Sequence, residues 1–259
     1  MDLEQIDQIK MEKQMIKGIV IHLDQEKREI LDNNWDGLFR LASQEDIPIV
    51  INLCNENSEK PPMVKEEKTL LEMAIHYVEK WSNRLYILNV ATQKEIDLIQ
   101  EARKRSLLIY AETTPQHLFP EDLSKANHLW KALNNNVIET IGSGYNINQQ
   151  GQDRVLFKGG NFSLLDPIFF LPFLLTAVNE KKIPLEKLVS LTSLNMQDIF
   201  ELNRTQDFVL VDMEKEQTIK KIHSGHTVSV KLKGWPIYTI IRDRIFSSPT
   251  QGYRVIRSN

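Results

Sequence analysis

Hydrophobic residues in the first 142 positions form short continuous runs rather than an alternating pattern. Runs of strand length lie at residues 16–23, 47–53, 84–90, 107–112 and 137–142. Between them, apolar residues recur at helical spacing at 35–46, 65–82 and 126–136, and Thr92 with Glu95 forms a capping-box pattern that begins another helix. Strands that are apolar throughout and alternate with helices predict a parallel sheet covered on both faces.

The pattern changes after residue 160. The very apolar stretch at 164–178 predicts a helix, and two more helices are predicted near 185–191 and 195–202. Short β-type segments follow at 207–213, 226–234 and 235–246, with Gly234 predicted to mark a turn. We therefore expect an α/β domain over residues 1–203 and a β-rich C-terminal segment over residues 204–259.

Composition narrows the class of protein. A net charge of -3 over 259 residues, with basic residues scattered along the chain, gives no case for nucleic-acid binding. The longest apolar run, 164–178, contains Asp166 and two prolines and is too short to span a bilayer. Cys54 is the single cysteine, which excludes an intrachain disulfide and favours a reducing compartment. No signal-peptide pattern is visible. We expect a cytoplasmic protein.

Polar side chains follow the predicted strands. In parallel α/β folds, residues just after the carboxyl ends of strands line the binding crevice. Here those positions hold a polar set: His22, Cys54 to Glu56, Asn89, Glu112 to His117, and Ser143 to Asn148. The crevice is predicted to lie among them.

Several stretches resemble the cyclic amidohydrolases, the family of dihydroorotase, dihydropyrimidinase (hydantoinase) and allantoinase. The "ETTPQHL" segment (112–118) resembles the family's Glu-x-Thr-Pro-His-His-Leu, and "VIETIGSGYN" (137–146) resembles its Ile-Asp-Val-Ile-Gly-Ser-Asp-His-Ala-Pro. "KGWPIYTIIR" (233–242) resembles its C-terminal β segment, and the similarity covers nearly the whole chain. The resemblance implies a TIM-type barrel beside a small β-sandwich, with zinc ions that activate a water to attack a cyclic amide. The expected fold class is α/β, a partial TIM-type (β/α) barrel with a short β-rich C-terminal segment.

Position by position, the resemblance implies that the metal ligands are absent. The chain starts around the family's fourth barrel strand, so the His-x-His segment has no counterpart. Other residues stand where the family has its carboxylated Lys, its two further His, the catalytic Asp and the His after it: Val20, Cys54, Asn89, Gly144 and Tyr145. With Asn148 they form the predicted pocket at the former metal site. Because zinc needs about three converging ligands, no metal and no other cofactor is expected.

For several residues, a catalytic or ligand-binding role remains open beside a purely structural one. Glu112 and His117 could form an acid–base pair, or a polar strand end with local hydrogen bonds. Cys54 could be a nucleophile, but no activating group is identifiable and the inert reading is favoured. The two histidines of the "HSGH" loop (223–226) could hold a metal, but a plain turn also explains this loop. The backbone N–H groups of "GSG" (142–144) could bind an anion, but turn geometry explains these glycines equally well.

About five barrel strands are predicted where eight close a ring. Either the sheet reorganises into an open α/β layer, or a second copy or a different protein covers it. We expect a non-catalytic dihydroorotase/hydantoinase-like protein that serves as a structural or binding subunit. Inactive dihydroorotase-like chains that partner aspartate transcarbamoylase provide a precedent within the resemblance. The alternative is an active cyclic-amide hydrolase with a rebuilt or partner-completed site, and a weaker third possibility is a small-molecule sensor.

Overall fold

The computed structural model describes residues 16–21, 28–53, 69–119, 123–144, 167–203, 205–223 and 226–247. The chain divides into two compact units, each of which combines two separate segments. Unit 1 comprises Met1–Gly144 and Val189–Leu202, and unit 2 comprises Tyr145–Leu188 and Asn203–Asn259. This grouping and the predicted division at residue 203 differ in where residues 145–188 belong.

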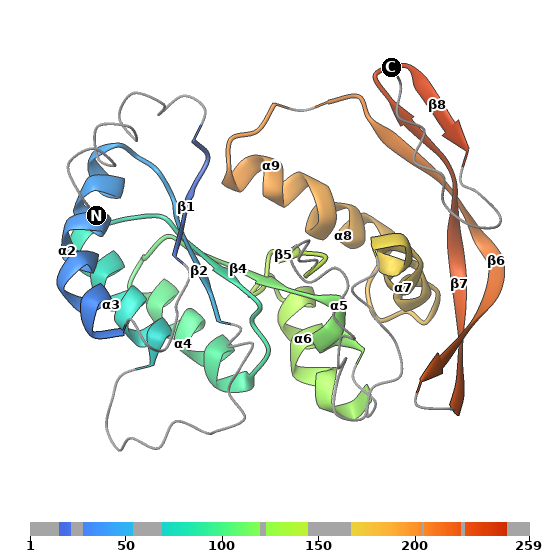
Figure 1. Ribbon diagram of the computed structural model, residues 1–259, viewed down its shortest axis with the longest axis horizontal. Coiled ribbons are helices and arrows are strands. Elements are labelled where there is room, and N and C mark those ends of the chain that lie inside the picture. Colours follow the sequence, from blue (N-terminus) through green and yellow to red (C-terminus); the bar gives the residue numbers. More distant parts are fainter. Residues whose placement is uncertain are drawn as a thin grey trace. The chain divides into compact units, whose positions relative to one another are not determined.

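Unit 1 is built on a five-stranded parallel sheet (Figure 1). Its strands follow chain order: β1 (Ile19–Ile21), β2 (Ile49–Asn52), β3 (Leu85–Leu88), β4 (Ile109–Thr113) and β5 (Thr140–Ile141). The connecting helices are α2 (Arg28–Gln44), α3 (Leu70–Trp81), α4 (Gln93–Lys104), α5 (Pro115–Leu118) and α6 (Asn127–Asn134), with a 3-10 turn at Leu123–Ala126. The predicted parallel sheet is confirmed, and so is the capping box in which Thr92 and Glu95 bond each other's backbone N–H groups.

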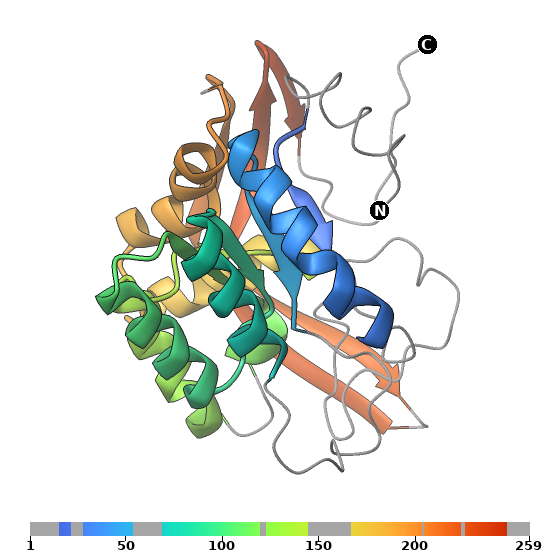
Figure 2. The same cartoon turned by 90° about the vertical axis from the view of Figure 1, so that its left-hand side faces the viewer.

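The two faces of this sheet are covered differently. Helices α2, α3, α4 and α6 form a row on one face, here called the outer face (Figure 2). On the opposite, inner face lie Val50 and Tyr86, which pack against Ile199, Met196 and Phe200. Those three residues come from or adjoin α9 (Asn195–Ile199), which a π-helical turn at Ser190–Leu194 precedes. Part of the inner face is therefore covered from within the same unit, as expected for an open α/β layer.

Unit 2 contains a three-stranded antiparallel sheet and two helices. Its elements are α7 (Pro167–Asn179), most of α8 (Leu185–Val189), β6 (Phe208–His223), β7 (His226–Ile241) and β8 (Arg244–Ser247), with strand order β6-β7-β8. The strands are longer than the sequence pattern predicted, because β7 continues through the position expected to be a turn. No helix in the ranges that the structure covers is long and apolar enough to cross a membrane.

Gly234 corrects the sequence prediction. It lies inside β7 rather than in a turn, with a positive φ of 98°. A Cβ there would lie 2.6 Å from Cβ of Leu175, so only glycine lets α7 approach the strand this closely. Thr176 and Asn179 of α7 hydrogen-bond the backbone of Lys233 next to it. The glycine thus serves helix packing, which composition alone does not distinguish from a turn.

Candidate functional site

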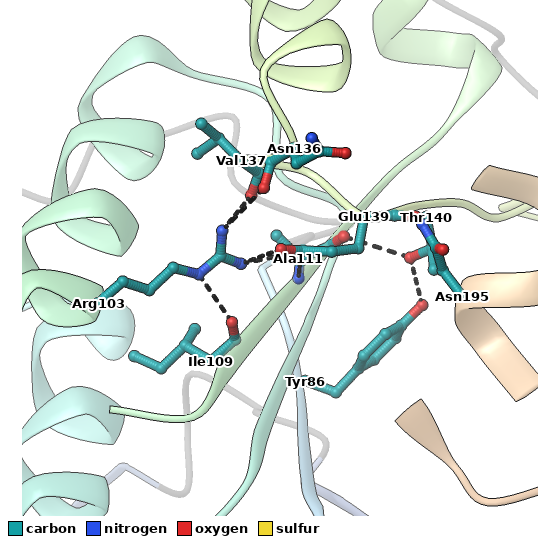
Figure 3. A network of polar contacts seen from close by, with 9 residues as sticks. All are labelled: Tyr86, Arg103, Ile109, Ala111, Asn136, Val137, Glu139, Thr140 and Asn195. Atoms are coloured by element: carbon teal, nitrogen blue, oxygen red, sulfur yellow. Dashed lines mark hydrogen bonds and ion pairs between the residues drawn. The ribbon is translucent and has the colours of Figure 1, made fainter. Parts of the chain in front are cut away.

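The carboxyl ends of the parallel strands carry a polar group of side chains on the inner face. Strand register places Tyr86 level with Tyr110, and Glu112 level with Thr140. Residues that are an even number of positions apart on a strand share a face, so Tyr86, Glu112 and Thr140 point to the same side. The three side chains meet there in one hydrogen-bonded chain, part of which Figure 3 shows.

Glu112 is the acidic member of this chain and is only 8% exposed. Its Oε2 lies 2.9 Å from the hydroxyl of Tyr86, which lies 2.6 Å from Oγ1 of Thr140. Oγ1 of Thr140 in turn lies 3.2 Å from the carbonyl oxygen of Ala111. Burial raises the pKa of Glu112 to about 7, although the Tyr86 hydrogen bond acts in the opposite direction.

Proton counting indicates which form of Glu112 fits this chain. The three contacts need three protons, whereas the hydroxyls of Tyr86 and Thr140 supply two. The Tyr86 hydroxyl donates to Oε2 of Glu112 and the Thr140 hydroxyl donates to the carbonyl oxygen of Ala111, so the 2.6 Å contact between the two hydroxyls takes a proton only when Glu112 is protonated and donates in turn. When Glu112 is ionised, Tyr86 must turn its proton toward the carboxylate and one contact is lost. The geometry and a pKa of about 7 therefore agree on a carboxyl group that holds its proton below neutral pH.

Gly142 makes room for this carboxyl group. A Cβ at residue 142 would lie 2.3 Å from Oε1 of Glu112, a distance that no side chain tolerates. Gly142, which was predicted to lie in a loop after β5, thus directly contacts the space that the Glu112 carboxyl group fills. Any larger residue at this position would push the carboxyl group out of its place.

A second glutamate, the partly buried Glu139, lies just before β5 and was missed by the sequence analysis (Figure 3). Its carboxylate forms an ion pair of 2.7 Å with Arg103 of α4 and accepts a hydrogen bond from the backbone N–H of Ala111. Arg103 also donates to the carbonyl oxygens of Ile109 and Val137. Burial raises the pKa of Glu139, with Arg103 opposing that rise. The signal that could have revealed it was an acidic residue within the apolar run "VIETIG".

The structure places three of the six predicted pocket residues. Val20 lies on the inner face and is 47% exposed. Asn89 has a positive φ of 64° and donates from Nδ2 to Oδ1 of Asn52 at 2.8 Å. Gly144 has a φ of 65°, a left-handed conformation that residues with a Cβ rarely adopt. Cys54, Tyr145 and Asn148 lie outside the described residues.

The predicted acid–base pair is not formed by the residues that the structure covers. Glu112 bonds Tyr86, whereas His117 lies in α5 and its buried Nε2 has no hydrogen-bond partner in the described part of the chain. Burial lowers the pKa of His117, and the charge of Glu95 opposes this. The structure does not describe the side chains of His223 and His226. In that same part of the chain, no three His, Cys, Asp or Glu side chains converge as metal ligands would.

The residues at the implied metal positions do not fit zinc. Val20 offers a hydrocarbon, Gly144 offers no side chain, and the amide of Asn89 is already bonded to Asn52. Zinc ligands in proteins are thiolate, imidazole or carboxylate groups. A metal-dependent step therefore has no support from these three positions.

Comparison with known proteins finds no matching family model. A dihydroorotase of Methanosphaera stadtmanae is 29% identical over 220 residues, which cover 73% of this chain and 50% of the relative. An allantoinase of Desulfitobacterium hafniense is 25% identical over 194 residues, which cover 62% of this chain and 41% of that protein. The chain thus spans about half the length of the curated relatives that it matches.

Two solved structures support the fold. Dihydropyrimidinase from Brevibacillus agri matches with a TM-score of 0.67 at 19% identity, covering 88% of this chain and 62% of that one. The inactive dihydroorotase-like domain of a CAD-like multifunctional protein of Chaetomium thermophilum matches with a TM-score of 0.54 at 16% identity, covering 82% and 69%. The predicted fold class, part of an amidohydrolase-type barrel with a C-terminal β segment, is confirmed.

Proposed function

We propose that this chain, a relative of the cyclic amidohydrolases, is a non-catalytic dihydroorotase/hydantoinase-like protein that acts as a structural or binding subunit. One observation carries the proposal. Val20, Asn89 and Gly144, which stand at implied ligand and proton-transfer positions, supply no metal ligand and no general base.

A structural neighbour offers a precedent for such a role. The Chaetomium thermophilum domain is described as inactive and belongs to a multifunctional protein. A barrel that has lost its chemistry can persist as a folded module within a larger assembly. By analogy, we propose that this chain contributes a folded surface rather than a reaction, with a homo-oligomeric or heteromeric partner.

The inner face supports a binding role within the same proposal. The Asn52–Asn89 amide pair and the Glu112 carboxyl group lie at the carboxyl ends of neighbouring strands. Neutral amides and a protonated acid both donate and accept hydrogen bonds, so they suit an uncharged polar ligand. No cation is needed for such recognition.

The alternative is an active cyclic-amide hydrolase with a rebuilt or partner-completed site. One observation favours it: Glu112 has a pKa of about 7, so its carboxyl group can exchange a proton near neutral pH. Its place at the strand ends is where a proton-transfer group would act. Glu112 is therefore the residue on which this alternative can be tested.

The decisive experiment measures metal content and turnover on one sample of purified full-length chain. Zinc is quantified, and dihydroorotate, dihydrouracil and allantoin are each assayed with and without added zinc. We expect no stoichiometric zinc and no hydrolysis above the background rate. Zinc near one or two ions per chain, or hydrolysis that the Glu112→Gln variant abolishes, would overturn the non-catalytic proposal in favour of the alternative.

A further inference from the structure

The segment that covers part of the inner face of the unit 1 sheet is an insertion between two segments of unit 2. Residues Val189–Leu202 belong to unit 1, whereas Tyr145–Leu188 before them and Asn203–Asn259 after them belong to unit 2. We call Val189–Leu202 the strap. Because neither of its ends continues into unit 1, contacts with the sheet, and not chain continuity, hold the strap in place.

The helical structure of the strap is irregular. The π-helical turn Ser190–Leu194 separates α8 from α9, and α9 itself has only five residues. Glu201 follows with a positive φ of 50°. Turns of π-helix interrupt the regular α-helical hydrogen bonds and are frequent at functional sites, and a helix as short as α9 is unstable alone in water. The strap therefore depends on its packing against the sheet.

Apolar contact beneath the strap centres on Tyr86. The ring of Phe200 lies edge to face at 4.9 Å from the ring of Tyr86, and Ile199 and Met196 pack in the same cluster. With the strap in place, Tyr86 is only 2% exposed. Its hydroxyl group is the one that donates to the Glu112 carboxyl group. Detachment of the strap would therefore admit water to Tyr86 and, through it, to Glu112.

Polar contacts tie the strap to the rest of unit 1 near both of its ends. Asn195 donates to the carbonyl oxygen of Glu139, directly before Thr140 of the hydroxyl chain (Figure 3). Arg84 forms an ion pair of 2.8 Å with Glu201, whose side chain is 69% exposed. Exposed ion pairs contribute little to stability. The strap is thus held mainly where it covers Tyr86 and where Asn195 reaches the start of β5.

Glu112 has no counter-ion on the strap. The other titratable or charged groups on the elements packed around it are Tyr86 and Tyr110 on the strands, Glu139 with its partner Arg103, His117 of α5, and Asp198 and Glu201 of the strap. The strap thus brings two carboxylates and no cation. Burial raises the pKa of Glu112 to about 7, and the hydrogen bond from Tyr86 opposes that rise. An ionised Glu112 is therefore better accommodated in water than beneath this cover.

We propose that Glu112 is a pH-sensitive switch for the strap: the protonated carboxyl group lets Val189–Leu202 stay docked, and its ionisation favours detachment of that segment from the inner face. The driving force is hydration of the carboxylate. Because the docked state binds its proton more tightly, the stabilisation of docking is complete below about pH 4.5 and is lost as pH rises through about 7. Detachment uncovers Val50 and Tyr86. This switch does not depend on the proposed function.

Hydrogen exchange of the full-length chain at about pH 6 and about pH 8 tests the switch. Protection factors, corrected for the intrinsic exchange rate at each pH, are compared between peptides of the strap and peptides of α3 and α4. If detachment exposes Glu112 fully, the protection of the strap should fall about tenfold between the two pH values. Low concentrations of urea should change it little, because local detachment exposes less surface than global unfolding.

Two variants identify the group that titrates. Glu112→Gln has no carboxyl proton to lose, so its strap should keep the same protection at both pH values. Asp198→Asn is the matched control, since it removes an exposed carboxylate of the strap itself and should retain the tenfold fall. Circular dichroism confirms that each variant is folded.

Three results would overturn the switch. The first is a wild-type strap whose protection does not change with pH. The second is a fall that persists in Glu112→Gln or disappears in Asp198→Asn. The third is a fall in the strap with the same urea dependence as in α3 and α4, because unit 1 would then open as a whole and the strap would have no separate detached state.

Discussion

The two faces of the parallel sheet in unit 1 follow different rules. The outer face is apolar: its residues in β2 and β3 are Ile49, Ile51, Leu85 and Ile87, all fully buried. The inner face mixes Val20, Asn52, Tyr86 and Glu112, whose exposure ranges from nearly half to almost none. Helix packing alone explains the outer face. On the inner face, the polar groups are accounted for by the hydrogen bonds that they make to one another.

Glu112 and Glu139 make the contrast specific. Burial raises the pKa of both, yet Glu139 has Arg103 as a counter-ion and Glu112 has a hydroxyl chain. The ion pair of Glu139 with Arg103 therefore links α4 to the edge of the sheet. Glu112 has no such partner and keeps its proton up to about neutral pH. The two glutamates thus differ in what compensates their burial, because only Glu139 has a cation within reach.

Removing the counter-ion should produce the largest effect. Arg103→Met leaves Glu139 half-enclosed without a charge partner and removes the hydrogen bonds to Ile109 and Val137. We expect the free energy of unfolding to fall by about 3 kcal/mol, at the lower end for a buried pair because both side chains retain some exposure. Chemical denaturation monitored by circular dichroism measures it.

Lys104→Met is the matched control for that variant. Its neighbouring ion pair with Glu101 is largely exposed, so its loss should change stability little. Adding Glu139→Gln to Arg103→Met should recover part of the loss, because the uncompensated charge is gone. Equal costs for the two single methionine variants would contradict the role given to Arg103.

On the inner face, Glu112→Gln should stabilise the protein at alkaline pH. The pKa of Glu112 is raised from 4.5 to about 7 in the folded state, so the folded chain binds more protons than the unfolded chain between these values. Stability from this group is complete below about pH 4.5 and is lost as pH rises through about 7. At about 1.36 kcal/mol per pKa unit, the loss amounts to roughly 3 kcal/mol.

Glutamine removes this dependence because its amide supplies the third proton of the hydrogen-bonded chain at any pH. Denaturation midpoints of the wild type and Glu112→Gln should coincide at about pH 4 and separate by about pH 8, with the variant more stable. Glu101→Gln, at an exposed site, is the control and should follow the wild type. A wild-type curve as flat as that of Glu112→Gln would show that folding does not raise the pKa of Glu112.

The contrast between the faces also explains what the sequence could reveal. Period and composition predicted the parallel strands because the outer-face residues of the central strands β2 and β3 are all buried. They predicted the capping box at Thr92 because that signal is local. Gly234 was misread since its role depends on Leu175, which is distant in the sequence and close only in the fold.

The site was less predictable for a related reason. Glu112 was identified as a candidate, either in an acid–base pair with His117 or in a hydrogen-bonded polar strand end, but its partners Tyr86 and Thr140 on neighbouring strands were not foreseen. Strand register decides which polar side chains meet, and register is not readable from one strand alone. Asn89 and Gly144 were placed by resemblance, while their left-handed backbone required coordinates.

Removing one hydroxyl from the inner face should have an intermediate effect. Tyr86→Phe keeps the ring contact with Phe200, whose ring centroid lies 4.9 Å away, but breaks the links to Glu112 and Thr140. Leaving two buried groups short of partners should cost about 2 kcal/mol in unfolding free energy. Tyr110→Phe, on the same face and without a hydrogen bond in the described network, is the control. Equal stability of the two variants would remove the hydroxyl chain as a stabilising feature.

The smallest effect is expected where α9 is tied to the sheet. Asn195 donates from Nδ2 to the carbonyl oxygen of Glu139 at 2.7 Å and so links the inner cover to the residue before β5 (Figure 3). Asn195→Ala should lower stability by about 1 kcal/mol, and Gln197→Ala, whose bond to Ser193 is 3.5 Å long, should cost less. Hydrogen exchange should quicken in α9 with Asn195→Ala while the outer helices keep their protection. Faster exchange across α3 and α4 as well would mean that the two faces are not independently stabilised.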